Sequence, residues 1–279
     1  MTQEALRASV ERLAEDPAPE HAEGRAVVDA LLSALEAGEI RAAVPGDGTW
    51  QVQPWVKRGI LLAFRLGVNV DVPAGPVFHF RDRDTLPTWD PTRSGRNVRV
   101  VPGGTTVRRG AYLGEGVVVM PPAYVNVGAF VGARTLVDSH ALVGSCAQVG
   151  SGVHLSAAAQ VGGVLEPVGS VPVVVEDDVF VGGNCGIYEG TRVCARAVLA
   201  AGVVLTRGVA VMDLVHERVL RAGAGESLII PEGAVVVPGA RPAAGSFAQA
   251  HGVLLQTPVI VKYRDAGTDA AAALEEALR

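Results

Sequence analysis

An aliphatic residue recurs at every sixth position over more than a hundred residues, and this period limits the possible folds more than any other feature. From Val101 to Val161 each sixth residue is Val or Leu, and from Val175 to Val211 each sixth residue is Val, Ile or Leu. Strands of hairpins alternate with period two and do not keep a six-residue phase over such a length. The period therefore indicates a solenoid in which three hexapeptides complete one triangular coil.

A second register of small or β-branched residues stands four positions after each aliphatic one, as at Ala123 and Ala141. One large and one small inward side chain per hexapeptide suits a narrow prism, because the large one fills the axis and the small one fits beside the corner. Glycine often stands directly before the small residue, as at Gly110 and Gly128, and permits a positive φ in the turn. Residues 99–216 are therefore predicted to form a β prism of about six coils in a mainly β protein.

The register breaks once, between Val161 and Val175, where the step is fourteen residues. This is two more than two regular hexapeptides, and the segment contains Pro167, Gly169 and Pro172. Because Pro and Gly favour turns, we expect a loop with two extra residues that bulges from one corner. Such loops commonly carry binding or catalytic residues.

An open solenoid exposes its terminal strands and needs caps at both ends. Residues 1–98 are predicted to form an N-terminal helical domain of three helices. Their signals are an apolar stripe in the first helix, Gly38 at the end of the second and Pro54 at the start of the third. Residues 217–279 are predicted to form a small C-terminal α/β cap of short strands, closed by a helix in AAAALEEALR.

Composition excludes several classes of protein. The net charge is −5 and 19% of the residues are charged, so no basic surface for nucleic acid is expected. No run of eighteen apolar residues occurs, and the N-terminus lacks the basic and apolar segments of a secretion signal, so we expect a cytoplasmic protein without membrane contact. Cys146, Cys185 and Cys194 form no CxxC pair, so we expect reduced thiols and no metal site.

Three segments carry a resemblance to a known family. They are WQVQPWVKRGILLAFRLG before the prism, RVVPGG at its entry, and VDSHALVGSCAQ followed by GGVLEP within it. Together they resemble the 2,3,4,5-tetrahydropyridine-2,6-dicarboxylate N-succinyltransferases, a family of hexapeptide-repeat acyltransferases, over about residues 50–265. The resemblance implies a left-handed parallel β-helix and a homotrimer whose active sites lie between neighbouring prisms.

The reaction that the resemblance implies is a step of lysine and diaminopimelate biosynthesis. A succinyl group passes from succinyl-CoA, a coenzyme A thioester, to the amine of tetrahydrodipicolinate in its ring-opened form, L-2-amino-6-oxopimelate. The family's catalytic acid corresponds to Asp138 in VDSHA, and its arginine for a substrate carboxylate corresponds to Arg99 in RVVP. Many members carry a pair of glutamates after the loop; here the first is Gly186, so only Glu189 remains as a second catalytic candidate.

The charge pattern of the coils fits an amine substrate that also carries two carboxylates. No Lys or Arg occurs in residues 135–191, whereas acids such as Glu166 do, so we expect an acidic wall that holds the amine. The carboxylates need arginines from elsewhere, and we assign Arg99 and Arg108 of the early coils, brought across a cleft between two chains. The alternative that Arg108 and Arg109 only keep the surface soluble stays open.

The later coils are the predicted site for the acyl donor. The run LAAGVVLTRGVA offers small residues beside a ligand, so we assign Ala201 and Gly202 to the pantetheine arm and Arg207 to a phosphate of coenzyme A. Ordinary coil packing is the alternative for all three residues. Three further alternatives stay open: His140 as the base, acetyl-CoA or another amine acceptor as the reactant, and a non-catalytic scaffold.

Overall fold

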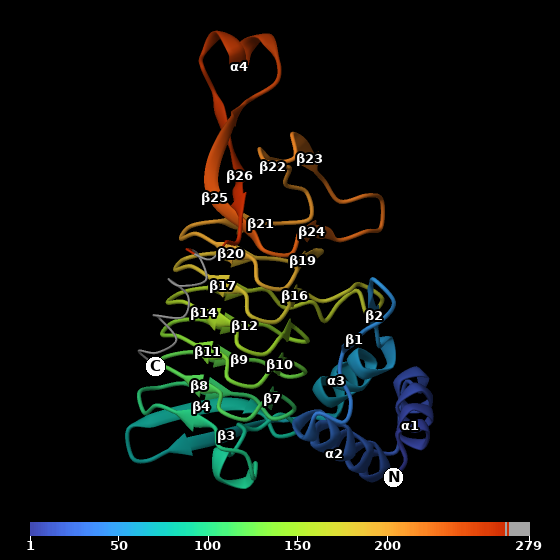
Figure 1. Cartoon of the computed structure of the whole chain (residues 1–279). Helices are drawn as coiled ribbons and strands as arrows, with labels where there is room; N and C mark the ends of the chain where they lie inside the picture. Colours follow the sequence, from blue (N-terminus) through green and yellow to red (C-terminus); the bar gives the residue numbers. More distant parts are fainter. Residues whose placement is uncertain (266, 268–279) are drawn as a thin grey trace.

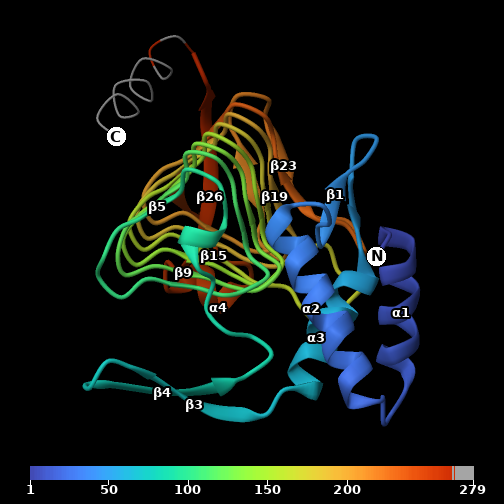
Figure 2. The ribbon, with the colours of Figure 1, turned by 90° about the horizontal axis from the view of Figure 1, so that it is seen from below.

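Three parallel sheets form the faces of a triangular prism, and a helical domain lies against one side of it (Figure 1). The computed structural model describes residues 1–265 and 267 of the 279 residues in the chain. Seen along its axis, the prism has one sheet on each side of the triangle (Figure 2). Its core is a column of aliphatic side chains that successive coils share.

We name each face after its first strand. The β5 face contains β5 Arg99–Val100, β8 Val118–Val119, β11 Leu136–Val137, β14 His154–Leu155, β17 Phe180–Val181, β20 Val198–Leu199 and part of β25 Ala234–Pro242. The β6 face contains β6 Thr106–Val107, β9 Tyr124–Val125, β12 Leu142–Val143, β15 Gln160–Val161, β18 Gly186–Ile187 and β21 Val204–Leu205. The β7 face contains β7 Tyr112–Leu113, β10 Phe130–Val131, β13 Gln148–Val149, β16 Val174–Val175, β19 Thr191–Val193 and β24 Leu228–Ile230.

The aliphatic register lies in the core, as predicted, from Val107 onwards. Each of its members from Val107 to Val211 is at most 5% exposed. Val101 is the exception: Val100 pairs with Val119 in its place, because the first coil is one residue longer than the regular eighteen. The second register is also buried over most of the prism, so one large and one small side chain per hexapeptide do build the core.

The turns adopt a left-handed backbone conformation even where the residue is not glycine. Seven non-glycine residues of the regular turns have φ between 57° and 64°: Arg134, His140, Cys146, Ala158, Asp178, Asn184 and Arg196. They stand at the same position of the hexapeptide as Gly110 and Gly128, whose φ values are 80° and 75°. The stacking of the coils therefore imposes this conformation, and glycine only removes its steric strain.

The loop that interrupts the register is longer than predicted. Val174 of β16 pairs with Gln148, twenty-six residues earlier, whereas Gln148 pairs with Phe130, eighteen residues earlier. The excess of eight residues lies in the segment 162–173, which connects β15 directly to β16. The prediction of two extra residues was wrong, because the loop replaces one turn rather than two hexapeptides.

The prediction that the coils run without interruption to residue 216 was also wrong. A strand forms at the in-phase position, β22 (Val211–Asp213), but it pairs with β23 (Arg218–Leu220) and with β26 (Leu254–Tyr263). The neighbour of β19 is instead β24, which resumes the prism after this excursion. A six-residue phase reports which side chains point inwards, and it does not specify which strand lies alongside.

The three helices predicted for the N-terminal region are present, together with two antiparallel strand pairs that were not predicted. Helices α1 (Gln3–Glu15), α2 (His21–Ala37) and α3 (Pro54–Leu66) bury one apolar face each, and Gly38 ends α2 with a φ of 74°. Their shared core includes two residues of the prism turns, Val127 and Cys146. The same region contains the antiparallel pair β1 (Ala43–Pro45) and β2 (Trp50–Val52), and the short helix η1 (Pro91–Arg93).

Polar and aromatic contacts fix this domain to the β7 face. Arg41 Nε donates to Gln148 Oε1 at 2.8 Å, and its guanidinium carbon lies 3.6 Å from the centroid of the Phe130 ring. Burial lowers the pKa of Arg41 to about 10, so it is still a cation at neutral pH. Trp50 Nε1 donates to Glu176 Oε1 at 3.1 Å. The domain is therefore part of the same body as the prism.

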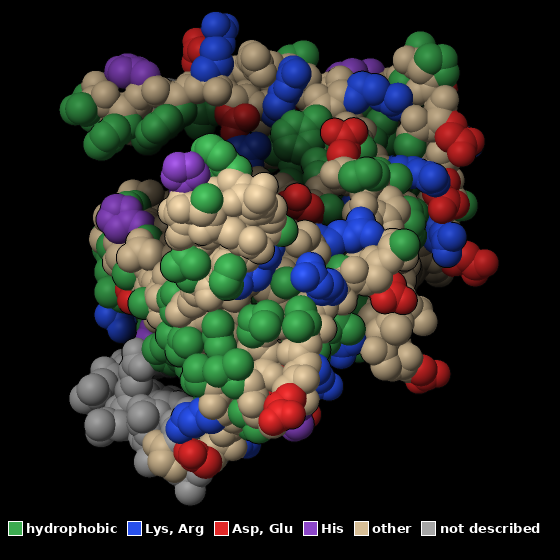
Figure 3. All heavy atoms as spheres, turned by 90° about the horizontal axis from the view of Figure 1, so that it is seen from above, with side chains coloured by type: hydrophobic (Ala, Val, Ile, Leu, Met, Phe, Trp, Pro, Cys, Tyr) green, Lys and Arg blue, Asp and Glu red, His purple; other side chains and the backbone are tan. Residues whose placement is uncertain are grey.

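A hairpin formed by β3 (Asn69–Ala74) and β4 (Phe78–Arg83) leaves the helical domain and runs beside the prism (Figure 2). Its register pairs Val72 with Phe80 and Ala74 with Phe78, so these apolar side chains share one face. Phe78 and Phe80 are 63% and 57% exposed. In Figure 3 the hairpin stands off from the body of the molecule with hydrophobic side chains turned towards the gap.

A longer hairpin of β25 and β26 extends from the opposite end of the prism, with the short helix α4 (Ser246–Ala250) at its tip (Figure 1). The apolar residues of this tip are exposed, Phe247 most of all at 75%. The closing helix predicted in AAAALEEALR lies outside the described residues. Among the helices of the described part, none is long and apolar enough to span a membrane.

Candidate active site

The turns between faces stack into three edges that run along the prism. The first edge joins the β5 face to the β6 face, the second joins the β6 face to the β7 face, and the third leads back to the β5 face. Each step of six residues moves the chain from one edge to the next. The edge on which a candidate side chain lies therefore follows from its position in the repeat.

The predicted acidic wall does not exist within one chain, because its acids lie on all three edges. Asp138 follows β11 on the first edge, whereas Glu166 and Glu189 lie on the second. Glu176 opens the turn of the third edge, where Arg192 Nε donates to its Oε1 at 2.7 Å. The prediction was wrong because neighbours in sequence that are six residues apart face different directions.

Asp138 occupies a rigid turn directly after an inward valine. Its backbone N–H donates to the Leu155 carbonyl of the next coil at 2.9 Å, and its carboxylate accepts from the Ser139 N–H at 2.6 Å. Asp138 is half-buried, whereas His140, in the same turn, is exposed. Its backbone and its carboxylate are both held by hydrogen bonds, so Asp138 has a more fixed position than His140 for a general base.

Glu189 is exposed on the second edge, and the neighbouring Tyr188 covers Gly186. A Cβ atom on Gly186 would lie 2.6 Å from the Tyr188 ring, so a larger residue would have to displace the ring. Tyr188 was not among the predicted site residues, although the glycine at position 186 was a signal of altered packing there. The ring thus fills the space beside position 186, where the family resemblance predicts a glutamate.

Glu166 is exposed in the loop 162–173 on the second edge, and the helical domain holds this loop. Leu165 packs against the helical core, and Lys57 Nζ of α3 donates to the Ser170 carbonyl at 2.6 Å. Sequence reasoning passed over Lys57 because it stands within the apolar pattern of a helix. Its rarity was the available signal, since the chain contains only two lysines.

Arg99 and Arg108 are not brought together within one chain. Arg99 is exposed on the β5 face in the first coil. Arg108 lies on the second edge, forms an ion pair with Asp82 of the β3–β4 hairpin, and has a side chain that is only 11% exposed. Such burial does not fit a purely solubilising role. The contact makes Arg108 an anchor of the hairpin, and Arg109 similarly binds Asp29 of α2.

The predicted donor residues face two edges. Ala201 and Gly202 lie on the first edge, where the nearest atom to a Cβ placed on Gly202 would be 3.9 Å away. Arg207 lies exposed on the second edge and packs over Gly190, and its Nη2 donates to the Gly223 carbonyl at 3.4 Å. Open space beside Gly202 is compatible with a ligand that passes along the first edge.

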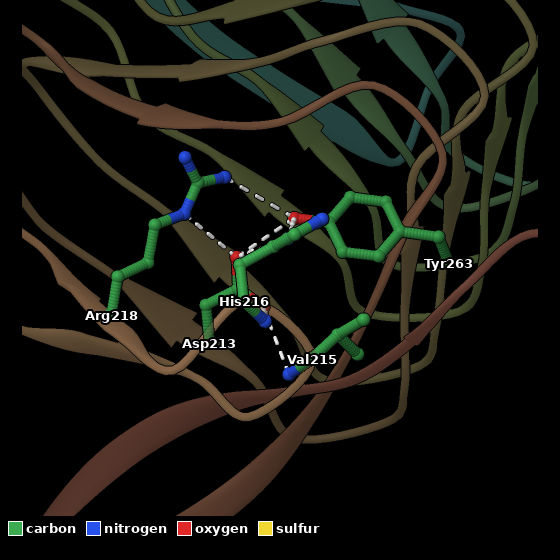
Figure 4. Close-up of polar contacts among 5 residues, drawn as sticks. All are labelled: Asp213, Val215, His216, Arg218 and Tyr263. Atoms are coloured by element: carbon green, nitrogen blue, oxygen red, sulfur yellow. Dashed lines mark hydrogen bonds and ion pairs between the residues drawn. The ribbon is translucent and has the colours of Figure 1, made fainter.

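A polar cluster at the end of the prism was not predicted from the sequence. The buried carboxylate of Asp213 accepts from Tyr263 Oη at 2.9 Å and from Arg218 Nε at 2.9 Å, and His216 Nδ1 lies 3.1 Å from the same oxygen (Figure 4). Burial alone would raise the pKa of Asp213, but these hydrogen bonds outweigh it and hold the pKa at about 2. The cluster fastens the β22–β23 hairpin to β26.

The described residues offer neither a reactive thiol in the core nor a metal-binding group. Burial raises the pKa of the Cys146 thiol to about 12, so the thiol stays protonated at neutral pH. The three cysteines are free. Within the part of the chain that the structure describes, no three His, Cys, Asp or Glu side chains come together as metal ligands.

Coils of this kind define a class of protein. The three parallel faces, the hexapeptide turns and the outward carboxylates are those of a hexapeptide-repeat transferase, and a family model described as "Hexapeptide repeat of succinyl-transferase" matches residues 172–207. A second model, described as "Tetrahydrodipicolinate N-succinyltransferase N-terminal", matches residues 3–66.

Named relatives narrow the class to one family. A protein of Azoarcus sp. (strain BH72) named 2,3,4,5-tetrahydropyridine-2,6-dicarboxylate N-succinyltransferase is 42% identical, and the match covers 94% of this chain and 92% of that protein. Proteins of the same name from Aromatoleum aromaticum and Polynucleobacter asymbioticus are 42% and 40% identical; these matches cover 91% of this chain and 89% and 90% of those proteins. The chain belongs to the 2,3,4,5-tetrahydropyridine-2,6-dicarboxylate N-succinyltransferase family.

Proposed function

We propose that this protein transfers the succinyl group of succinyl-CoA to the amine of ring-opened tetrahydrodipicolinate, L-2-amino-6-oxopimelate. The observation that carries the proposal is the near-full-length similarity, at 42% identity, to proteins named for this reaction. The reaction belongs to lysine and diaminopimelate biosynthesis, and we assign the enzyme to the cytoplasm, where succinyl-CoA is available. A non-catalytic scaffold would give no reason for a half-buried outward carboxylate at Asp138.

Asp138 is the proposed general base. The substrate amine attacks the thioester carbonyl, so a C–N bond forms, the carbonyl electrons move to oxygen, and their return breaks the C–S bond. The amine proton passes to the Asp138 carboxylate, and the protonated Asp138 gives it to the departing sulfur, so that coenzyme A leaves as a thiol. The hydrogen bond from the Ser139 N–H holds the carboxylate in the turn and leaves its other oxygen for the amine.

We further propose a homotrimer of left-handed prisms with active sites between chains. The argument is that Asp138 and Glu189 lie on different edges, so one chain cannot place both carboxylates at one substrate. A second prism that presents its second edge to the first edge of its neighbour would bring them together. The exposed apolar face of the β3–β4 hairpin supports such a neighbour, because hydrophobic surface of this kind marks interaction sites.

In this arrangement Arg99 of one chain binds a carboxylate of the substrate. Glu166, on the second edge of the neighbouring chain, binds the substrate amine. Coenzyme A passes along Ala201 and Gly202 on the first edge of one chain, and Arg207 on the second edge of the neighbouring chain binds one of its phosphates. The open space beside Gly202 and the exposure of Arg207 support these assignments.

The test is a thiol-release assay with the purified protein, the ring substrate, and either succinyl-CoA or acetyl-CoA. We expect release of coenzyme A that depends on both substrates and is faster with succinyl-CoA. Equal or faster turnover of acetyl-CoA would contradict the assignment of succinyl-CoA as the acyl donor. Release that does not depend on the ring substrate would contradict the proposed acceptor.

A further inference from the structure

Lys57 is a lysine whose side chain is completely buried in the helical domain. It lies in α3 among apolar residues and is 0% exposed. Among the residues that the structure describes, no carboxylate forms an ion pair with its ammonium group. Burial lowers the pKa of Lys57. Burying a cation without a carboxylate partner lowers the stability of the folded state. The contact that Lys57 does make is therefore a candidate for a functional role.

That contact is with the loop that interrupts the prism. Lys57 Nζ donates to the Ser170 carbonyl at 2.6 Å. The loop leaves the prism on the side of the helical domain, between β15 and β16 (Figure 1). A carbonyl oxygen bound by a buried ammonium group is held more firmly than one bound by water, because the ammonium group is itself shielded from water and, among the described residues, has no competing partner.

A second anchor lies five residues earlier in the same loop. Leu165 packs against the helical core, and its neighbour Glu166 is exposed. The Ser170 N–H donates to the Pro167 carbonyl at 3.0 Å, which closes the stretch between the two anchors into a turn. The helical domain therefore fixes both ends of the short segment that presents Glu166.

We propose that Lys57 is a positioning residue that holds the loop 162–173 through the Ser170 carbonyl, so that the Glu166 carboxylate is presented to the amine substrate. The inference rests on the proposed function, in which Glu166 binds that substrate. It assigns the N-terminal helical domain a task in the reaction, because α3 supplies the group that orders the loop.

The experiment compares Lys57→Met with Arg58→Met in the full-length protein. Methionine fills a similar space without a charge, whereas Arg58 is the next residue of the same helix and is half-buried at the surface. For Lys57→Met we expect the KM for the amine substrate to rise about tenfold, the effect of losing one charge-assisted hydrogen bond. The KM for succinyl-CoA should not change, and Arg58→Met should behave as the wild type.

Two structural readouts separate a positioning role from a merely structural one. The amide of Ser170 should exchange its hydrogen faster in Lys57→Met, and the midpoint of thermal unfolding should stay the same or rise, because the buried charge is gone. A structural lysine would instead lower the midpoint. If Lys57→Met does not fold, Lys57→Gln, which keeps a neutral donor, should give a smaller rise in the same KM.

The proposal is overturned if Ser170 exchange is unchanged, or if exchange accelerates while the KM for the amine substrate stays the same. A different result would refute the proposed function itself. If the wild-type protein released no thiol with the ring substrate, the reaction would be wrong, and Glu166 would lose its assigned ligand. Hydrogen exchange at Ser170 would still report whether Lys57 holds the loop.

Discussion

Asp138 draws its proposed role from the residue before it. Val137 is fully buried in the core, and this fixes the backbone of the turn so that the next side chain must leave the prism. The stacked coil supplies a hydrogen bond to the backbone on one side, and the turn itself supplies one to the carboxylate. A general base needs such a fixed position, because proton transfer requires it to lie within hydrogen-bond reach of the reacting amine.

Asp138→Asn should remove the base and keep the shape of the turn. We expect kcat to fall about 10²- to 10⁴-fold, roughly 3 to 5 kcal/mol of barrier, because asparagine cannot accept the proton. Binding of succinyl-CoA should survive, since the donor is assigned to coils near residue 200. Steady-state thiol release and equilibrium donor binding measure the two effects. Glu189→Gln should lower kcat less than Asp138→Asn does. The assignment of Asp138 as the base is wrong if Asp138→Asn keeps more than a tenth of the wild-type kcat while Glu189→Gln or His140→Ala abolishes turnover.

Arg207→Ala should weaken the binding of succinyl-CoA and leave the rate of the chemical step unchanged. Arg207 is exposed on the second edge, far in sequence from Asp138, and its proposed partner is a phosphate of coenzyme A. A contact made equally in the ground and transition states raises KM without changing kcat. We expect the KM for succinyl-CoA to rise about tenfold at low ionic strength and less at high salt. An unchanged KM at low salt removes Arg207 from the site.

At the scale of elements, the sequence predicts what faces inwards and says less about what lies alongside. The prism core follows from the six-residue period, because a side chain's direction depends only on its position in the coil. The partner of β22 and the length of the loop before β16 depend on contacts between distant segments. The period could not reveal either one.

The candidate residues show the same division. The outward placement of Asp138 could be predicted, because it depends only on the position of the residue in the repeat. The pairing of Arg108 with Asp82 could not be predicted, since it joins a turn of the prism to a hairpin of the N-terminal region. The contact of Lys57 could not be predicted for the same reason, because its partner, the Ser170 carbonyl, is more than a hundred residues away in the chain.

The contact between the β22–β23 hairpin and β26 should weaken in acid, because it depends on the ionised carboxylate of Asp213. The pKa of Asp213 is held at about 2, below its usual value of 3.8, so the unfolded chain takes up the proton more readily than the folded one. The stability that Asp213 contributes is therefore complete above about pH 4 and is lost as the pH falls towards about 2. Urea unfolding midpoints at several pH values should show this loss.

Asp213→Asn should be less stable than the wild type at pH 7 and should show a weaker dependence on pH between about 4 and 2. The control is Glu217→Gln, since Glu217 is an exposed carboxylate of the same hairpin. Its unfolding midpoints should follow those of the wild type. Identical acid profiles for Asp213→Asn and the wild type would show that the cluster does not stabilise the hairpin.

At the scale of the whole molecule, two hairpins project from the prism and do not pack over its core. The β3–β4 hairpin and the β25–β26 hairpin leave opposite ends of the prism, and both carry exposed apolar side chains (Figure 1). The candidate carboxylates are spread over separate edges of one prism. Both observations have one explanation in the proposed trimer, where hairpins and edges meet those of a neighbouring chain.

Phe80→Asp should therefore dissociate the trimer and abolish activity together. Phe80 lies on the apolar face of the β3–β4 hairpin and is 57% exposed, so a charge there does not disturb the core of its own chain but opposes burial against a second copy. The matched control is His79→Asp, which adds the same charge to the opposite, polar face of the hairpin. Sedimentation velocity at micromolar concentration should give a trimer for the wild type and for His79→Asp, and smaller species for Phe80→Asp. A wild type that sediments as a fully active monomer would contradict both the trimer and the active site between chains.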